Sequence, residues 1–166
     1  MATQSGQEQT YEILLVEDNP GDVELTKDTI EDSKYSANVS VVDDGEPAMA
    51  YLRQEGEYAE APRPDLILLD LNLPMKDGLE VLREMGGDSE LSSIPVMILT
   101  GTTAEESFLD SYGIPVSRFS RKPMDLNRFE QVISRLDDPA MHRPIAPQEP
   151  EPVVPPDEKK KWWWPF

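Results

Sequence analysis

The sequence predicts an α/β domain in which five helices cover both faces of a five-stranded parallel sheet, a doubly wound fold. Segments typical of strands and of helices alternate through the first 137 of the 166 residues. The run 66–69 is apolar at every position, which is typical of a strand buried on both faces. Reactive polar residues also follow four of the expected strands, where open α/β sheets bind their ligands.

Strands are expected at residues 11–16, 39–42, 66–70, 94–99 and 118–120. A helix is expected at residues 20–32, because Pro20 suits a first helical turn and Asp22 favours the positive end of the helix dipole. The next helix, at residues 46–53, is followed by a Gly- and Pro-rich connection at 56–64.

Three further helices complete the alternation. The helix at residues 78–85 ends before Gly86, and the helix at 103–112 is stopped by Gly113. The last helix, at residues 124–136, carries an apolar stripe that would face the sheet. Residues 1–9 are polar and do not resemble a signal peptide, so we expect a flexible N-terminus.

The composition narrows the classes of function. The chain has no cysteine and no apolar stretch near the ~20 residues of a membrane span, which fits a cytoplasmic protein. Its net charge is −18, and this field would repel phosphates, so we expect no direct nucleic-acid binding. The same negative charge would increase solubility, or it would be an adaptation to a host that lives at high salt.

Residues at the expected strand ends suggest a metal and phosphoryl site. Glu17 and Asp18 follow the first strand, Asp70 ends the third, Thr100 follows the fourth and Lys122 the fifth. Crowded carboxylates repel one another, and Mg²⁺ prefers carboxylate, carbonyl and water oxygens. Taken singly, each of these residues would be an ordinary solvated side chain, and only their combination favours a site.

Asp70 is then the candidate nucleophile, because a carboxylate can accept a phosphoryl group as an acyl phosphate. Lys122 would neutralise charge on the phosphoryl oxygens, and Asn72 would offer its backbone carbonyl to the metal. The Thr100 hydroxyl would bond a phosphoryl oxygen. Phe119 lies three residues before Lys122 and would belong either to the core or to a switch.

These segments together resemble the receiver domains of two-component response regulators. The resemblance covers residues 11–136 and rests on the following segments: 14–19 (LLVEDN), 68–74 (LLDLNLP), 77–78 (DG), 98–101 (ILTG) and 121–123 (RKP). Segments 16–20 (VEDNP), 56–58 (GEY) and 62–65 (PRPD) are similar to those of stand-alone regulators that serve bacterial phytochromes.

The resemblance implies a flavodoxin-like fold with strand order 2-1-3-4-5 and a receiver domain at residues 10–137. Asp70 would be the phosphoacceptor and Lys122 its phosphoryl partner. Glu17 and Asp18 would hold Mg²⁺ together with Asp70 and the Asn72 backbone, and Thr100 and Phe119 would form the switch. Glu17 departs from the aspartate of many members, and its longer side chain would reach the metal through water.

The resemblance also implies partners. A separate sensor histidine kinase, of the phytochrome type by analogy, would supply the phosphoryl group, since the single histidine, His142, lies outside the domain. A homodimer would form through the fourth helix, fifth strand and fifth helix. The alternatives are a receiver-like adaptor that never takes phosphate and an aspartyl-phosphate phosphatase, which would need an acid at Asn72. The chain is therefore expected to be a signalling protein and not an enzyme.

The tail differs in composition from the domain. Residues 138–166 include eight prolines and no periodic apolar pattern, so we expect a disordered segment that forms no output domain. It ends in KKKWWWPF, at residues 159–166. Lysines beside tryptophans are typical of segments that bind a membrane interface or a groove on a partner protein. The third possibility is a segment without a function.

Overall fold

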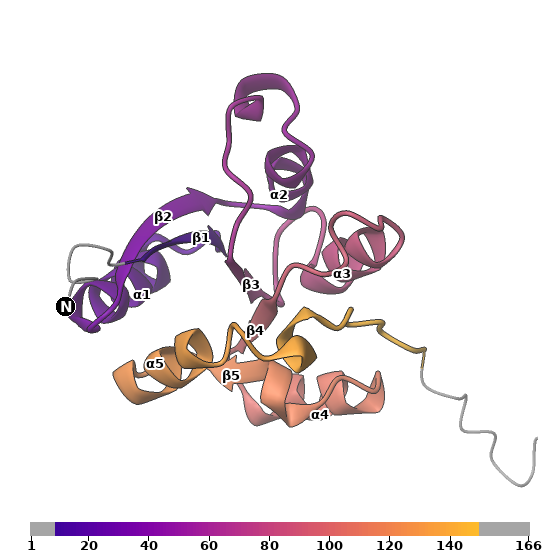
Figure 1. Ribbon diagram of the computed structural model, residues 1–166. Helices are drawn as coiled ribbons and strands as arrows, with labels where there is room; N and C mark the ends of the chain where they lie inside the picture. Colours follow the sequence, from indigo (N-terminus) through magenta and orange to yellow (C-terminus); the bar gives the residue numbers. More distant parts are fainter. Residues whose placement is uncertain (1–8, 150–166) are drawn as a thin grey trace, which may run out of the picture.

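The computed structural model describes residues 9–149, and its fold is the predicted doubly wound α/β domain. All neighbouring strands pair in parallel, in the order β2-β1-β3-β4-β5, which confirms the predicted topology (Figure 1). The strands are β1 (Thr10–Val16), β2 (Ser36–Val42), β3 (Leu66–Asp70), β4 (Val96–Thr100) and β5 (Phe119–Arg121).

The helices lie on both faces of this sheet (Figure 1). One face carries α1 (Pro20–Asp32) and α5 (Leu126–Ser134). The other face carries α2 (Gly45–Leu52), α3 (Gly78–Gly86) and α4 (Thr103–Ser111). Within residues 9–149, no helix is long and apolar enough to cross a membrane.

The central strands are apolar on both sides because helices cover both faces of the sheet. Every residue of β3 and β4 is buried, so both faces of each strand must be apolar. Leu14, Ile67 and Ile98 point into the core beneath α2, α3 and α4, whereas Leu15 and Leu68 point toward α1 and α5. Burying one such side chain contributes about 1.5–3 kcal/mol, so these strands fix the position of the residues at their ends.

A polar residue begins each helix that follows a strand. It accepts a hydrogen bond from a backbone N–H of the first turn, which would otherwise lack a partner. These capping residues are Asn19, Asp44, Asp77, Thr102 and Asp125. Short capped connections therefore hold the loops at the carboxyl edge of the sheet in fixed conformations.

Some predicted boundaries shift by a few residues. β2 begins at Ser36 instead of residue 39, because this polar stretch pairs in register with the start of β1. α5 is shorter than the predicted helix 124–136, because Asp125 caps its start and Arg135 is its C-cap. Such ends depend on caps and partners more than on the apolar period.

The expectation of a disordered tail from residue 138 is wrong for the part that the structure describes. Residues 139–142 form a 3-10 helix (Pro139–His142), and Met141 and Ile145 are buried. The His142 ring lies 2.7 Å from the Leu136 carbonyl, and the Gln148 N–H donates to Tyr112 O. We call residues 138–149 the strap. The predicted roles of the KKKWWWPF end fall on residues outside the described range.

Arg118 ties the strap to the sheet. Its buried guanidinium donates to the carbonyls of Val96, on β4, and Arg143, in the strap. Burial lowers the pKa of Arg118. The two carbonyls would lose their donor if this side chain were shortened or made apolar.

We therefore expect Arg118→Met to lower the free energy of unfolding by about 2 kcal/mol, the usual cost of buried carbonyls left without donors. Urea unfolding followed by circular dichroism would measure the change. The matched control is Arg135→Met, because Arg135 is exposed and a change there should stay within about 0.5 kcal/mol. Equal losses in the two variants would show that the Arg118 contacts do not hold the strap.

Candidate functional site

Three carboxylates meet where β1 and β3 end. Val16 pairs with Leu69 in neighbouring strands, so Glu17 and Asp18 leave β1 beside Asp70 at the end of β3. One carboxylate oxygen from each of the three acids lies within 4.8 Å of the others. The structure thus brings together the three acidic side chains that the sequence predicted for a metal.

Two of these acids are almost completely withdrawn from water. Glu17 is 2% exposed and Asp70 is 3% exposed, whereas Asp18 lies at the surface. Burial, together with hydrogen bonding to Asp70, raises the pKa of Glu17 to about 7. A buried carboxyl group of this kind ionises readily only when a cation lies beside it.

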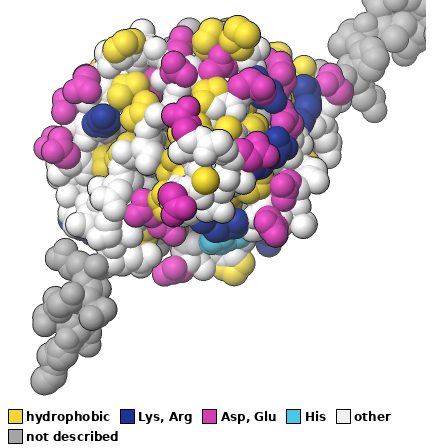
Figure 2. Space-filling model, turned by 90° about the horizontal axis from the view of Figure 1, so that it is seen from above, with side chains coloured by type: hydrophobic (Ala, Val, Ile, Leu, Met, Phe, Trp, Pro, Cys, Tyr) yellow, Lys and Arg dark blue, Asp and Glu magenta, His cyan; other side chains and the backbone are white. Residues whose placement is uncertain are grey.

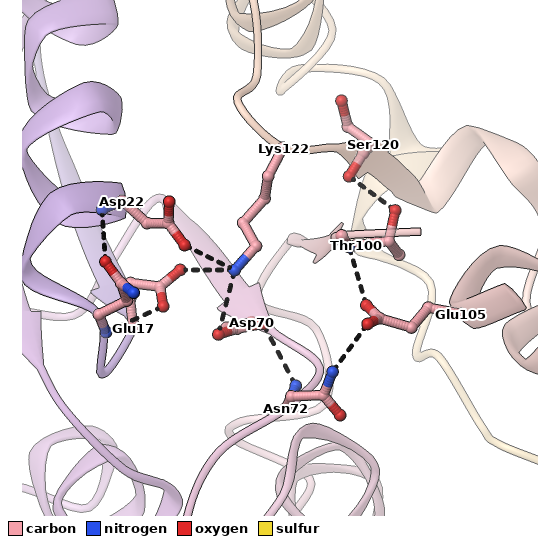
Figure 3. A network of polar contacts seen from close by, with 10 residues as sticks. Glu17, Asp22, Asp70, Asn72, Thr100, Glu105, Ser120 and Lys122 are labelled. Carbon is pink, nitrogen blue, oxygen red and sulfur yellow. Dashed lines mark hydrogen bonds and ion pairs between the residues drawn. The ribbon is translucent and has the colours of Figure 1, made fainter. Parts of the chain in front are cut away.

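Lys122 places an ammonium group over these acids (Figure 3). Its Nζ lies 3.2 Å from Glu17 Oε1, 3.4 Å from Asp70 Oδ2 and 3.1 Å from Asp22 Oδ2. Burial lowers the pKa of Lys122, but the nearby Asp70, Asp22 and Glu17 outweigh it, so the net shift is upward. The lysine therefore stays charged and holds the position expected for it.

Asp22 is a member of the site that the sequence analysis missed. It lies in the first turn of α1, where its charge was attributed to the helix dipole alone. In the structure its carboxylate accepts a hydrogen bond from Lys122 Nζ, 100 residues away in the sequence. No motif marks this residue, because its partner depends on how α1 and the end of β5 approach each other.

Asn72 connects the phosphoacceptor candidate to α4 (Figure 3). Its backbone N–H donates to Asp70 Oδ1 at 3.2 Å, and its side-chain Nδ2 donates to Glu105 Oε2 at 2.8 Å. Glu105 also accepts from the Gly101 N–H at 2.8 Å. Glu105 therefore bridges the loops after β3 and β4, a role that the sequence analysis did not assign.

Thr100 is fully buried at the end of β4. Its hydroxyl lies 3.3 Å from Glu106 Oε2 and 3.3 Å from the Ser120 carbonyl. Arg121 holds Glu106 from the other side, with Nη2 at 2.9 Å from Oε1. The hydrogen bonds and charge of Arg121 lower the pKa of Glu106, so this glutamate stays ionised.

Phe119 lies in the core beneath α4 and is only 7% exposed. The sequence left it as either a core residue or part of a switch, and here its ring packs as a core residue. Any later movement of this ring therefore starts from a buried position and would repack the edge of the sheet at β5.

The acidic cluster fits a hard divalent cation. Its donors are all oxygens, and two of the three carboxylates are buried, where their mutual repulsion is strong. Lys122 neutralises only part of this charge. Glu17, Asp18 and Asp70 would hold Mg²⁺, which would offset the rest.

Comparison with known proteins agrees with this geometry. Residues 13–134 match the model of the response regulator receiver domain. The response regulator Rcp1 of Synechocystis sp. is 40% identical over 125 residues, which are 75% of this chain and 85% of that protein.

Solved structures give the same assignment. The bacteriophytochrome response regulator AtBRR is 41% identical with a TM-score of 0.70, over 78% of this chain and 94% of that one. The phosphorylated cyanobacterial phytochrome response regulator RcpA is 45% identical with a TM-score of 0.63, over 78% and 93%. The Mn²⁺-bound form of Rcp1 is 38% identical with a TM-score of 0.62, over 82% and 99%.

The family match spans most of the chain and includes every residue of the acidic cluster and Lys122. Receiver domains bind Mg²⁺ or Mn²⁺ at such an acidic pocket, and they act as signalling modules of two-component systems. The chain belongs to the family of response regulator receiver domains and is similar to the response regulators associated with phytochromes.

Proposed function

We propose that the protein accepts a phosphoryl group on Asp70, from the phosphohistidine of a sensor kinase and with Mg²⁺, and signals through a changed interaction face. The observation that carries this proposal is the placement of buried Asp70 between an acidic pair and the Lys122 ammonium group. A nucleophile, a metal site and a counter-charge for the phosphoryl oxygens thus lie within one small volume.

The transfer forms one bond and breaks one. A carboxylate oxygen of Asp70 attacks phosphorus, the P–N bond to the donor imidazole breaks, and the freed imidazole nitrogen keeps the electron pair. Asn72 donates its N–H to Asp70 Oδ1 and so fixes the carboxylate, while Lys122 offsets charge on the phosphoryl oxygens. Bound Mg²⁺ would neutralise charge on the carboxylates and the phosphoryl group together.

The response would spread through Thr100 and Glu106. A phosphoryl group adds about two negative charges, and its oxygens would compete with Glu106 for the Thr100 hydroxyl. Glu106 is tied to Arg121 on β5, so its release would change the surface formed by α4, β5 and α5. Phe119 helps to line an open depression on this surface, between α4 and β5, so a movement of its ring would change the shape of that face.

The proposed partners follow from the relatives and from the charge. Phytochrome-associated relatives support a phytochrome-type kinase as the donor, and a second copy of the chain or another protein would read the changed face. Acidic side chains are scattered across the face that Figure 2 shows, and the net charge of −18 supports protein partners in place of nucleic acid. The cysteine-free composition supports a cytoplasmic location.

Acetyl phosphate provides a direct test, because it needs no kinase. We expect the intact mass to rise by one phosphoryl group in the presence of Mg²⁺ and to stay unchanged when EDTA removes the metal. Circular dichroism in EDTA would show that the fold is retained. If neither acetyl phosphate nor any phosphohistidine donor labels the folded protein, it is a phosphate-independent adaptor and the proposal fails.

A further inference from the structure

A partly apolar groove lies between α3 and α4, beside the loop that carries Asn72. It encloses about 330 Å³, at the lower end of the range for small-ligand pockets. Its apolar lining comes from Leu71, Leu79, Ala104 and Phe108, and its polar lining from Asn72, Asp77 and Glu105. Phe108 is 43% exposed, which is unusual for so large an apolar ring.

One face of α4 continues this groove toward the strap. Ala104, Phe108 and Tyr112 are spaced four residues apart, so they lie on the same side of the helix. The rings of Phe108 and Tyr112 are 4.7 Å apart between centroids. An apolar stripe about 12 Å long therefore runs from the C-terminal end of α4 to the groove.

The described chain ends beside this stripe. The Gln148 N–H donates to Tyr112 O at 2.9 Å, and Glu149 forms an ion pair with Arg83 of α3 at 2.7 Å. Arg83 itself lies 5.9 Å from the centre of the Tyr112 ring. The described residues thus end between the C-terminal ends of α3 and α4 (Figure 1).

The end of the sequence matches the groove in chemistry. Residues 159–161 are lysines and residues 162–164 are the three tryptophans of the chain. The charged residues that line the groove, Asp77 and Glu105, are both acidic. A tryptophan is a frequent anchor in apolar pockets, and lysines beside acids add long-range attraction.

The connection is long enough for this segment to reach the groove. Twelve residues lie between Glu149 and Trp162. A flexible chain of that length has a root-mean-square span of about 20 Å, and a proline-rich chain spans more, so either exceeds the length of the stripe. A short tether also gives an effective concentration of about millimolar, which favours the chain's own groove over that of a second copy.

We propose that residues 159–166 dock in the α3–α4 groove of their own chain. An indole ring lies in the apolar part of the groove, and the lysines lie beside Asp77 and Glu105. The docked segment then contacts Glu105, which bridges the loops that flank Asp70. This docking needs no phosphoryl group and is independent of the proposed function.

Tryptophan fluorescence of the full chain tests the docking, because every tryptophan lies in the segment. We expect emission at shorter wavelength than that of a free peptide of residues 150–166, and weaker quenching by acrylamide. Both effects should be lost in Phe108→Lys, which places a cation in the groove. They should remain in Leu25→Lys, a matched change at an exposed apolar residue on α1.

A second variant leaves the folded domain untouched. Replacing Lys159, Lys160 and Lys161 together by glutamate should also abolish the protection, since it reverses the charge of the segment. If the full chain emits at the same wavelength as the free peptide, the proposal is wrong. A later shift on adding anionic vesicles would then indicate a membrane surface as the binding site and would not rescue the proposal. Protection that is lost on dilution would assign the segment to a second copy, and protection that survives Phe108→Lys would place it on another surface.

Discussion

Asp70→Asn is expected to abolish labelling by acetyl phosphate while the fold remains. Asparagine has the same shape as aspartate but lacks the carboxylate that forms the acyl phosphate. The change also removes one charge from a buried acidic cluster, so we expect the free energy of unfolding in EDTA not to fall. Intact mass in Mg²⁺ measures the labelling, and urea unfolding measures the stability.

Asp65→Asn is the matched control, because Asp65 immediately precedes β3 at the strand's opposite end. Its carboxylate accepts a hydrogen bond from the Glu12 N–H, and an asparagine oxygen can keep that bond. This variant should be labelled as fully as the unchanged protein. Labelling of Asp70→Asn at the normal level would place the phosphoryl group on another residue.

The residues that the sequence predicted for the site are those fixed by their place on a strand. Asp70 ends a run of buried apolar residues, and the carboxyl ends of parallel strands meet at one edge. Glu17, Asp18 and Lys122 follow from the same rule, so their approach could be expected without knowledge of side-chain contacts. The strand order could not be predicted in this way, because the alternation of strands and helices does not determine which strand is central. Only the family resemblance supplied the order.

The contacts that the sequence did not predict join elements that are distant in the chain. The Asp22–Lys122 pair depends on the approach of α1 to the end of β5, and the Glu106–Arg121 pair on that of α4 to β5. Local sequence patterns cannot predict contacts between distant elements. An exposed acid in the first turn of a helix, for example, is equally well explained by stabilisation of the helix dipole.

The strap was missed for a related reason. A proline-rich segment shows no helical or strand period, and its composition is typical of disorder. Met141 and Ile145 are nevertheless buried, and Arg118 donates to the Arg143 carbonyl. A few buried side chains and scattered polar contacts form no recognisable sequence pattern, yet they can hold a segment against the surface of a domain that is already folded.

Lys122→Met is expected to slow labelling by acetyl phosphate by about 100-fold or more, the usual loss when a group that stabilises developing charge is removed. Methionine keeps much of the apolar stem but leaves Glu17, Asp70 and Asp22 without their shared cation. The time course of the mass increase in Mg²⁺ measures the rate. Lys122→Arg keeps a positive charge and should lose less.

The same variant should also respond more strongly to metal. With the ammonium group gone, the acidic cluster repels itself without compensation, so we expect Lys122→Met to unfold at lower temperature than the unchanged protein in EDTA. Mg²⁺ binds the folded cluster and should raise the unfolding temperature of the variant more than that of the unchanged protein. Equal shifts in both proteins would mean that Lys122 and the metal do not offset the same carboxylates, and the arrangement proposed for phosphoryl transfer would then be wrong.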